Sequence, residues 1–279
     1  MLWDRLRRRL QALGLADLSA YMERLEDEAA GPAEWRRLEG EVTVGETYFL
    51  RYAEQFAALR ETILPQLIEA RRPSRRLRIW SAGCSTGAEP YSVAILLHEL
   101  LGAQLADWRI SILGTDINEA ALDRATEGLF GPWALRALSP EQKQAWFTQE
   151  GRHHRLRRPF RSLVRFRRSN LLDLLGQQAP LDLNEFDLIL CRNVLIYFHP
   201  DVVEQLVDVL GARLNPDGWL LLGHAEPNLA FERTLRAETV AGATAYRRRE
   251  APLTPAPEEP WSPPAFSEDP TPAPSPPRK

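Results

Sequence analysis

The segment L-R-I-W-S-A-G-C-S-T-G-A-E-P-Y-S, residues Leu77–Ser92, begins as a short apolar strand and runs into the start of a helix. A turn of small residues, Gly83–Gly87, joins the two, and its glycines let the backbone approach a ligand closely. A strand, a small-residue turn and a helix start in this order predict a nucleotide-type binding edge. A plain turn between a strand and a helix has the same pattern, so this motif alone leaves both interpretations open.

The type of ligand follows from what the turn lacks and from the next strand. Ser85 stands where the second glycine of a dinucleotide motif would be, and no Gly-Lys-Ser/Thr follows as in a phosphate-binding loop. The next strand, W-R-I-S-I-L-G-T-D over residues Trp108–Asp116, ends on an acid that could bond ribose hydroxyls or cap the following helix. A ligand with a ribose but without phosphates fits best, and S-adenosylmethionine is such a ligand.

The rest of this region alternates strands with helices. Strands are expected at F-D-L-I-L-C, residues 186–191, and at W-L-L-L-G, residues 219–223. A helix between them, over about 201–214, is expected to stop at N-P-D-G. An antiparallel pair is expected between about 234 and 248. Alternation of this kind predicts an α/β fold with a doubly wound, mostly parallel sheet.

Three segments do not follow this alternation. Residues 1–72 contain leucines at helical spacing and predict a small helical N-terminal domain and linker, whose last helix, about 53–69, is bent or shifted by Pro65. Residues from about 127 to 168 predict a subdomain inserted into the main domain of residues 73–249. Residues 250–279 are rich in proline and predict a disordered tail.

Composition excludes several classes of protein. Of the 279 residues, 44% are hydrophobic and 26% are charged, as in ordinary globular proteins. The formal net charge of -3 does not indicate any particular class of partner. Cys84 and Cys191 are the only cysteines, which predicts no disulfide framework, no metal motif and a reducing, cytoplasmic location. No apolar run approaches the roughly 20 residues that span a bilayer, so we expect no membrane insertion.

Polar residues follow the strand that ends at Cys191. The segment R-N-V-L-I-Y-F, residues Arg192–Phe198, comes directly after it, and ligands of such sheets bind at the carboxyl ends of the strands. The Asn/Asp-Pro-Pro-aromatic motif that is common in methyltransferases acting on nucleic-acid bases is absent here. An arginine next to the transfer site suits an anionic acceptor better than an amine.

Five motifs in this order resemble the chemotaxis receptor methyltransferase (CheR-type) family over about residues 6–248. They are E-V-T-V-G-E-T-Y-F-L-R at 41–51, the turn segment at 81–92, G-T-D-I-N at 114–118, C-R-N-V-L-I-Y-F at 191–198 and G-H-A-E at 223–226. The resemblance implies a class I methyltransferase fold with a small all-α N-terminal domain and an inserted antiparallel β-subdomain. It also implies methyl esterification of glutamate side chains on the cytoplasmic domain of methyl-accepting chemoreceptors, with S-adenosyl-L-methionine as cofactor and S-adenosyl-L-homocysteine as product.

The resemblance also implies roles for single residues. The positions that match the family's cofactor site are Thr47, Arg51, Gly83, Glu89, Asp116, Asn170, Leu171, Arg192 and Asn193. Arg51 and Tyr197 match residues near the transferred methyl group and are the expected catalytic residues. A glutamate carboxylate, with a pKa of about 4.3, is already ionised at neutral pH and needs no general base. The site is expected to align the acceptor and to remove its water instead.

The sequence departs from the family pattern in a few places. Gly45 stands where the family usually has asparagine, Leu50 replaces a usual phenylalanine, and the N-terminal domain looks short. Some family members grip a peptide at the receptor's C-terminus with the inserted subdomain. Here the corresponding segment, Thr148–Phe166, looks shorter, with Gly151 as its flexible point and Pro159 removing a donor from a strand. We therefore expect a monomer that docks through its N-terminal helices and active-site cleft without this tether.

Two other interpretations remain open. One is a class I methyltransferase that acts on another protein or on a small carboxylate, which would share every cofactor residue. The other is a signalling protein that binds the cofactor without catalysis, which Gly45 supports and which Arg51 and Tyr197 argue against. The basic run Arg152–Arg168 has few aromatic neighbours, so we expect an edge that meets protein and no nucleic-acid partner.

Overall fold

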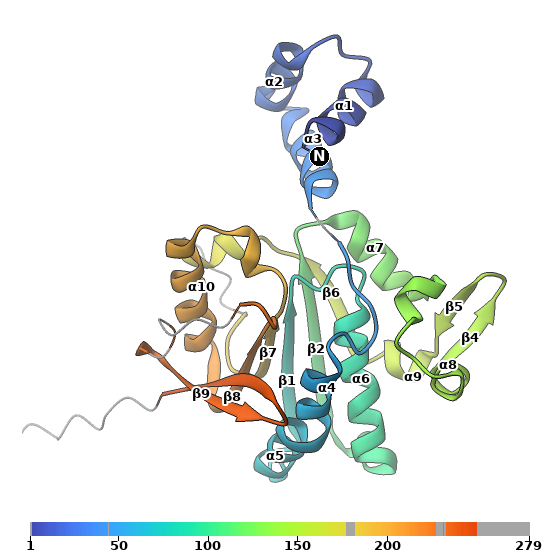
Figure 1. Ribbon diagram of the computed structural model, residues 1–279, viewed down its shortest axis with the longest axis vertical. Helices are drawn as coiled ribbons and strands as arrows, with labels where there is room; N and C mark the ends of the chain where they lie inside the picture. The colour runs from blue at the N-terminus through green and yellow to red at the C-terminus, as the bar shows by residue number, and fades with distance from the viewer. Residues whose placement is uncertain (1, 44, 177–181, 227–230, 232, 250–279) are drawn as a thin grey trace, which may run out of the picture. The chain divides into compact units, whose positions relative to one another are not determined.

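The computed structural model describes residues 2–43, 45–176, 182–226, 231 and 233–249 (Figure 1). The proline-rich tail expected from residue 250 lies outside these residues. The described residues form a seven-stranded sheet with helices on both of its faces. The strand order is β6 (Val164–Arg168), β2 (Arg109–Asp116), β1 (Arg76–Ala82), β7 (Phe186–Cys191), β8 (Leu214–Leu222), β10 (Ala243–Arg248) and β9 (Leu235–Val240).

The strands from β6 to β8 run parallel, and β10 and β9 continue the sheet as an antiparallel pair. The order reverses at β1, because the chain continues to β2 and β6 on one side and then returns to β7 on the other. In sheets of this kind, ligands bind outside the carboxyl ends of the strands at the reversal. The doubly wound, mostly parallel sheet predicted from the alternating pattern is confirmed.

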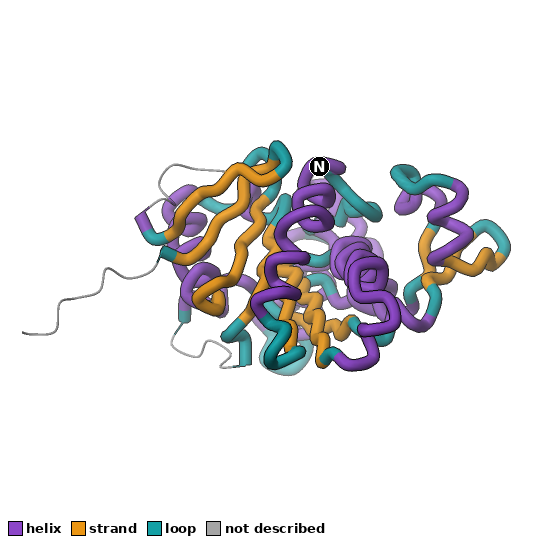
Figure 2. Tube along the Cα trace, turned by 90° about the horizontal axis from the view of Figure 1, so that it is seen from below, coloured by secondary structure: helices purple, strands orange, loops and turns teal. Residues whose placement is uncertain are grey.

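The apolar sequence of β7 is explained by burial on both faces. Side chains alternate along a strand, so Leu188 and Leu190 pack into one core cluster, while Ile189 and Cys191 pack into another. The first cluster includes residues of α4 (Ala53–Ala58), α5 (Leu64–Ala70) and α6 (Ala88–Leu101), and the second includes residues of α10 (Pro200–Ala212). Figure 2 views these layers from below. The site-bearing end of β7 is therefore held between two helical layers.

The helix expected over about 53–69 is interrupted near Pro65, as predicted. It consists of α4, a π-helical segment η1 (Leu59–Ile63) and α5. Pro65 has no N–H to donate to the carbonyl group four residues earlier, which lies inside η1. The wider π turn accommodates this loss without ending the helix.

The predicted N-terminal helices are α1 (Leu2–Leu13), α2 (Leu18–Glu26) and α3 (Gly31–Val42). Their small core consists of Leu10, Tyr21, Leu25 and Leu38. The hydroxyl of Tyr21 donates to the buried carboxylate of Glu34 at 2.9 Å. Burial, with help from this carboxylate, raises the pKa of Tyr21 to about 12. The hydroxyl therefore stays protonated and remains a donor at neutral pH.

A second sheet of three antiparallel strands lies between β2 and β6 in the sequence. It has the order β3 (Leu129–Phe130), β5 (His153–Leu156) and β4 (Phe147–Glu150), and its neighbours in the chain are α7 (Glu119–Glu127), η3 (Pro132–Leu135), α8 (Pro140–Trp146) and α9 (Arg158–Arg161). The predicted antiparallel subdomain is confirmed. Its predicted end at about residue 168 is wrong, because Val164 and Phe166 give the arginine-rich segment a strand pattern and β6 pairs with β2 in the large sheet.

Two further details differ from the expectation. Pro159 lies in the first turn of α9, where the missing N–H leaves no helix bond unmade, so it does not interrupt a strand. The helix that was expected to stop at N-P-D-G is α10, which already ends at Ala212. The N-P-D-G segment, residues 215–218, belongs to β8. The 3₁₀ turns are η2 (Gly102–Asp107), η4 (Leu171–Leu175) and η5 (Leu195–Tyr197). In the described part of the chain, every helix is too short or too polar to cross a membrane.

Candidate active site

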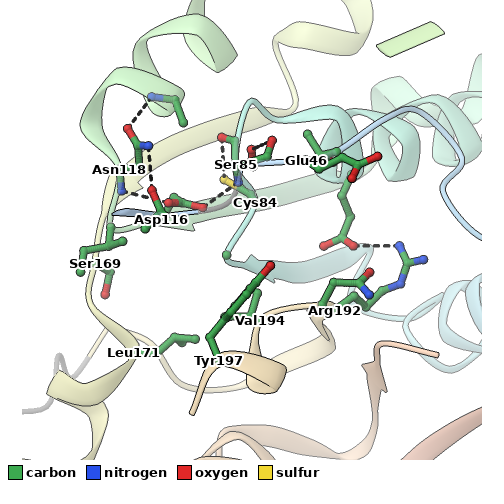
Figure 3. A pocket seen from close by; sticks show the side chains of 18 of the residues that line it. Glu46, Cys84, Ser85, Asp116, Asn118, Ser169, Leu171, Arg192, Val194 and Tyr197 are labelled. Atoms are coloured by element: carbon green, nitrogen blue, oxygen red, sulfur yellow. Dashed lines mark hydrogen bonds and ion pairs between the residues drawn. The ribbon is translucent and has the colours of Figure 1, made fainter. Parts of the chain in front are cut away.

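Residues that follow β1, β2, β6 and β7 line one cavity of about 380 Å³, shown in Figure 3. All ten residues that the sequence associates with cofactor binding or catalysis line it. They are Thr47, Arg51, Gly83, Glu89, Asp116, Asn170, Leu171, Arg192, Asn193 and Tyr197. The fold therefore brings together segments that are far apart in the sequence, and the individual roles of these residues remain predictions.

Asp116 ends β2, and two backbone N–H groups hold its carboxylate. Oδ2 accepts from Ser85 at 2.7 Å, and Oδ1 accepts from Asn118 at 2.9 Å. Burial raises the pKa of Asp116 above its ordinary value, against the effect of these hydrogen bonds. The N-cap of α7 is Asn118, whose side chain accepts from Ala121. Asp116 is therefore not the helix cap, and its place on the cavity wall suits a contact with a ribose.

Close contacts shape the turn after β1. Gly83 has a φ of 74°, and a Cβ there would lie 2.3 Å from Cγ2 of Val194. The hydroxyl of Ser85 donates to the carbonyl of Gly45 at 2.9 Å. Ser85 and Asn193 have φ values of 51° and 59°, a left-handed region that residues with a side chain rarely adopt. Such conformations persist only where the surrounding structure fixes the backbone.

The guanidinium of Arg192 is buried, and each of its three nitrogens donates a hydrogen bond. Nη1 donates to Oε2 of Glu89 at 2.8 Å, Nε donates to Oε1 of Gln55 at 2.6 Å, and Nη2 bonds the carbonyl of Arg51. Glu89 also accepts from the hydroxyl of Ser81 at 2.7 Å. Glu89 thus neutralises the charge of Arg192 inside the protein, and the preference of this arginine for an anionic acceptor stays a prediction.

Arg51 and Tyr197 are the remaining candidates for contact with an acceptor. Tyr197 is 58% exposed, and Figure 3 shows its side chain reaching into the cavity from the segment after β7. Nη1 of Arg51 donates to the carbonyl of Glu46 at 2.6 Å. The carboxylate of Glu46 pairs instead with Arg136 at 3.2 Å. Because Arg51 bonds a neutral carbonyl group, its charge remains available to an anion.

The lining of the cavity fits S-adenosylmethionine. The buried oxygen Oδ1 of Asn193 accepts no hydrogen bond from the described residues, and the amino group of the cofactor could supply the missing donor. Leu171 and Ile117 give the wall apolar surface, and Asp116 gives it an acceptor for hydroxyl groups. Among the residues that the structure describes, no group of three or more His, Cys, Asp or Glu side chains is placed to hold a metal ion.

Two residues that support the site were not singled out from the sequence. Gln55 joins Arg192 to the carbonyl of Leu222, to which its Nε2 donates at 2.8 Å. Glu226 accepts hydrogen bonds from the backbone after β7. The G-H-A-E motif was a signal for Glu226, but only the structure shows what its side chain touches. Nothing in the sequence around Gln55 distinguishes it from an ordinary helix residue.

Comparison with known proteins identifies the family. A family model described as "CheR methyltransferase, SAM binding domain" matches residues 45–243, and one described as "CheR methyltransferase, all-alpha domain" matches residues 1–43. A chemotaxis protein methyltransferase of Salmonella typhimurium is 37% identical to this chain over 243 residues, which cover 86% of this chain and 81% of that protein.

Two further relatives of this chain are also named as methyltransferases. A chemotaxis protein methyltransferase of Escherichia coli is 36% identical over 243 residues, covering 86% of this chain and 81% of that protein. A probable biofilm formation methyltransferase of Pseudomonas aeruginosa is 35% identical over 248 residues, covering 87% of this chain and 55% of that protein. The predicted fold class, methyltransferase activity and cofactor S-adenosylmethionine are confirmed. The chain belongs to the CheR methyltransferase family.

Proposed function

We propose that this chain esterifies glutamate side chains on the cytoplasmic domain of chemoreceptors, with S-adenosylmethionine as the methyl donor. The observation that carries the proposal is the pair Arg51 and Tyr197 on the wall of a cavity that fits this donor. The described residues that line the cavity include neither histidine nor lysine. A carboxylate acceptor, ionised at neutral pH, needs no such base, whereas an amine must first lose a proton. The names of the chemotaxis relatives support the same acceptor.

The residues around the cavity have different roles in the proposed reaction. When bound, the donor supplies a methyl group on a positively charged sulfur atom. Asp116 and Asn193 hold the donor, while Arg51 holds the acceptor carboxylate by charge-assisted hydrogen bonds. The hydroxyl of Tyr197 would donate to an acceptor oxygen and hold the acceptor in a fixed position. The apolar surface at Leu171 excludes water, which strengthens these interactions.

We also propose that the chain acts as a monomer in the cytoplasm. It docks on the receptor through its N-terminal helices and the open side of the cavity, without a peptide tether. The three-stranded sheet supports this absence of a tether: only Gly151 and Arg152 connect β4 to β5, and the two strands pair over their whole length. A two-residue hairpin turn leaves no loop that could open to admit a peptide.

Transfer of tritiated methyl groups to receptor cytoplasmic fragments tests this function. We expect label in the fragment, its release as methanol under mild base, and its loss when the acceptor glutamates are replaced by alanine. Base-stable label would indicate an amide or amine product and would contradict esterification. A fragment that takes no label from a chain that still binds S-adenosylhomocysteine would exclude that receptor as the acceptor.

A further inference from the structure

The carboxylate of Glu226 accepts hydrogen bonds from five backbone N–H groups. Oε1 accepts from Val194 at 2.9 Å, Leu195 at 2.8 Å and Ile196 at 3.3 Å, and Oε2 accepts from Asn193 at 3.0 Å and from Gly223. Glu226 follows β8 and is only 7% exposed, whereas four of these donors follow β7. One side chain therefore joins the segments that leave two neighbouring parallel strands.

The hydrogen bonds of the Glu226 carboxylate require a particular local geometry. A buried carboxylate is unfavourable unless hydrogen bonds replace its water, and backbone N–H groups form strong, charge-assisted bonds with it. Gly223 is needed at the end of β8, because a Cβ there would lie 2.3 Å from Oε2 of Glu226 and 2.6 Å from the backbone nitrogen of Asn193. The glycine and the glutamate of the G-H-A-E motif thus depend on each other.

The donors belong to the segment that carries two predicted site residues. Asn193 is held in a left-handed conformation, and its Oδ1 is the buried cavity oxygen that accepts no bond from the described residues. Tyr197 ends η5, whose N-cap residue Val194 provides no side-chain hydrogen bond. Glu226 supplies that missing acceptor from outside the helix. Its carboxylate therefore fixes the backbone on which both side chains depend.

We propose that Glu226 is a positioning residue of the methyl-transfer site. It holds the backbone of residues 193–196 so that the side chain of Asn193 meets the cofactor and that of Tyr197 meets the acceptor. The part that concerns the acceptor rests on the proposed function, and the part that concerns the cofactor does not. Glu226 itself is expected to touch neither molecule.

Glu226→Gln tests this role with little change in size. The amide turns one acceptor oxygen into a donor, so some of the five N–H groups would face another N–H group. We expect the Kd for S-adenosylhomocysteine, measured by calorimetry, to rise by about 10-fold and kcat to fall by about 10- to 100-fold, the order expected for a displaced catalytic group. Glu226→Asp keeps the charge on a shorter side chain and should lie between the wild type and Glu226→Gln.

Asp187→Asn is the matched control. Asp187 is also a buried carboxylate that accepts several hydrogen bonds, from Arg71, Arg78 and Asn215, but it lies near the start of β7, away from the cavity. We expect Asp187→Asn to lower the melting temperature without changing kcat or the Kd. If Glu226→Gln behaved like Asp187→Asn at a temperature where both are folded, Glu226 would be merely structural and the proposal would fail.

A double-mutant cycle with Tyr197→Phe separates the two halves of the proposal. If Glu226 acts through Tyr197, Glu226→Gln should reduce kcat less in the Tyr197→Phe protein than in the wild type. Full additivity would overturn the part that concerns the acceptor. Should the wild type methylate no receptor fragment, the proposed function would fail, while the calorimetric Kd would still decide whether Glu226 positions Asn193.

Discussion

Glu89 and Arg192 are separated by 103 residues in the sequence, yet their side chains form an ion pair at 2.8 Å in the wall of the cofactor cavity. The side chains are 12% and 1% exposed, respectively. Glu89 lies in the first turn of α6 after β1, and Arg192 follows β7, so the pair connects the two neighbouring strands at which the sheet order reverses. A buried pair of this kind adds little net stability compared with well-packed apolar side chains, because removing two charges from water is costly.

Removing one partner should be costly. We expect Arg192→Met to lower the free energy of unfolding by about 3–5 kcal/mol, because the charge of Glu89 would remain buried without its partner. Urea denaturation followed by circular dichroism measures this loss. The exposed pair Arg60 and Glu99, at 3.0 Å, provides the control, since Arg60→Met should cost no more than about 1 kcal/mol. Equal losses in the two variants would contradict the assignment.

Cofactor affinity should depend on Asp116. We expect Asp116→Ala to weaken binding of S-adenosylhomocysteine by roughly 1.5–3 kcal/mol, the contribution of a hydrogen bond to a charged group. Calorimetric titration measures the change, and a circular dichroism spectrum confirms that the variant is folded. An unchanged Kd in a folded variant would exclude Asp116 as the ribose ligand.

Asp116 should also make stability depend on pH. Burial raises its pKa in the folded protein above the ordinary value of 3.8, so folding favours its protonated form. This contribution to stability is present below about pH 3.8 and is lost as the pH rises through the folded pKa. Asp116→Asn does not titrate, so its melting temperature relative to the wild type should increase as the pH rises above about 3.8. A constant or decreasing difference would show that the carboxylate is not destabilised by burial.

Arg51 and Tyr197 should matter for catalysis more than for stability. Tyr197 is largely exposed and Arg51 donates to a backbone carbonyl group, so truncation removes little packing. We expect Arg51→Ala and Tyr197→Phe to lower the rate of methyl transfer at least about 10-fold, with melting temperatures close to that of the wild type. Near-normal turnover together with a large fall in melting temperature would assign both residues a structural role.

Binding of a receptor-tail peptide should be weak. Arg155, in the middle strand of the three-stranded sheet, is already paired with Glu150 at 2.6 Å, which reduces its attraction for an acidic peptide. Calorimetry with a peptide that carries tryptophan and phenylalanine should show only weak binding that disappears at higher salt. A scrambled peptide of the same charge is the control. Micromolar affinity at physiological salt, specific to the native order, would show that the tether is used.

The sequence was most informative where function is carried by contiguous motifs. Asp116 ends one apolar strand and Arg192 directly follows another, so the rule that ligands bind at the carboxyl ends of parallel strands placed them at one site. The same rule could not show that Glu89 neutralises the charge of Arg192, because this pairing depends on the directions of side chains that come from two different strands. Gln55 and Glu226 likewise contact residues that lie far away in the sequence. The end of the inserted subdomain was predicted at the wrong place because the many arginines of β6 make its alternation of apolar and polar residues hard to recognise.

One side chain at the edge of the cavity has a consequence for building chimeric enzymes. Besides capping α7, Asn118 donates through Nδ2 to the carbonyl of Gly40 at 3.2 Å and to the hydroxyl of Thr43 at 3.0 Å. Any residue at position 40 offers a carbonyl group, but the second acceptor is a side-chain oxygen at position 43, which threonine or serine supplies. A graft of foreign N-terminal helices onto this catalytic domain should therefore be joined before residue 43, so that Thr43 is kept, or carry serine or threonine there.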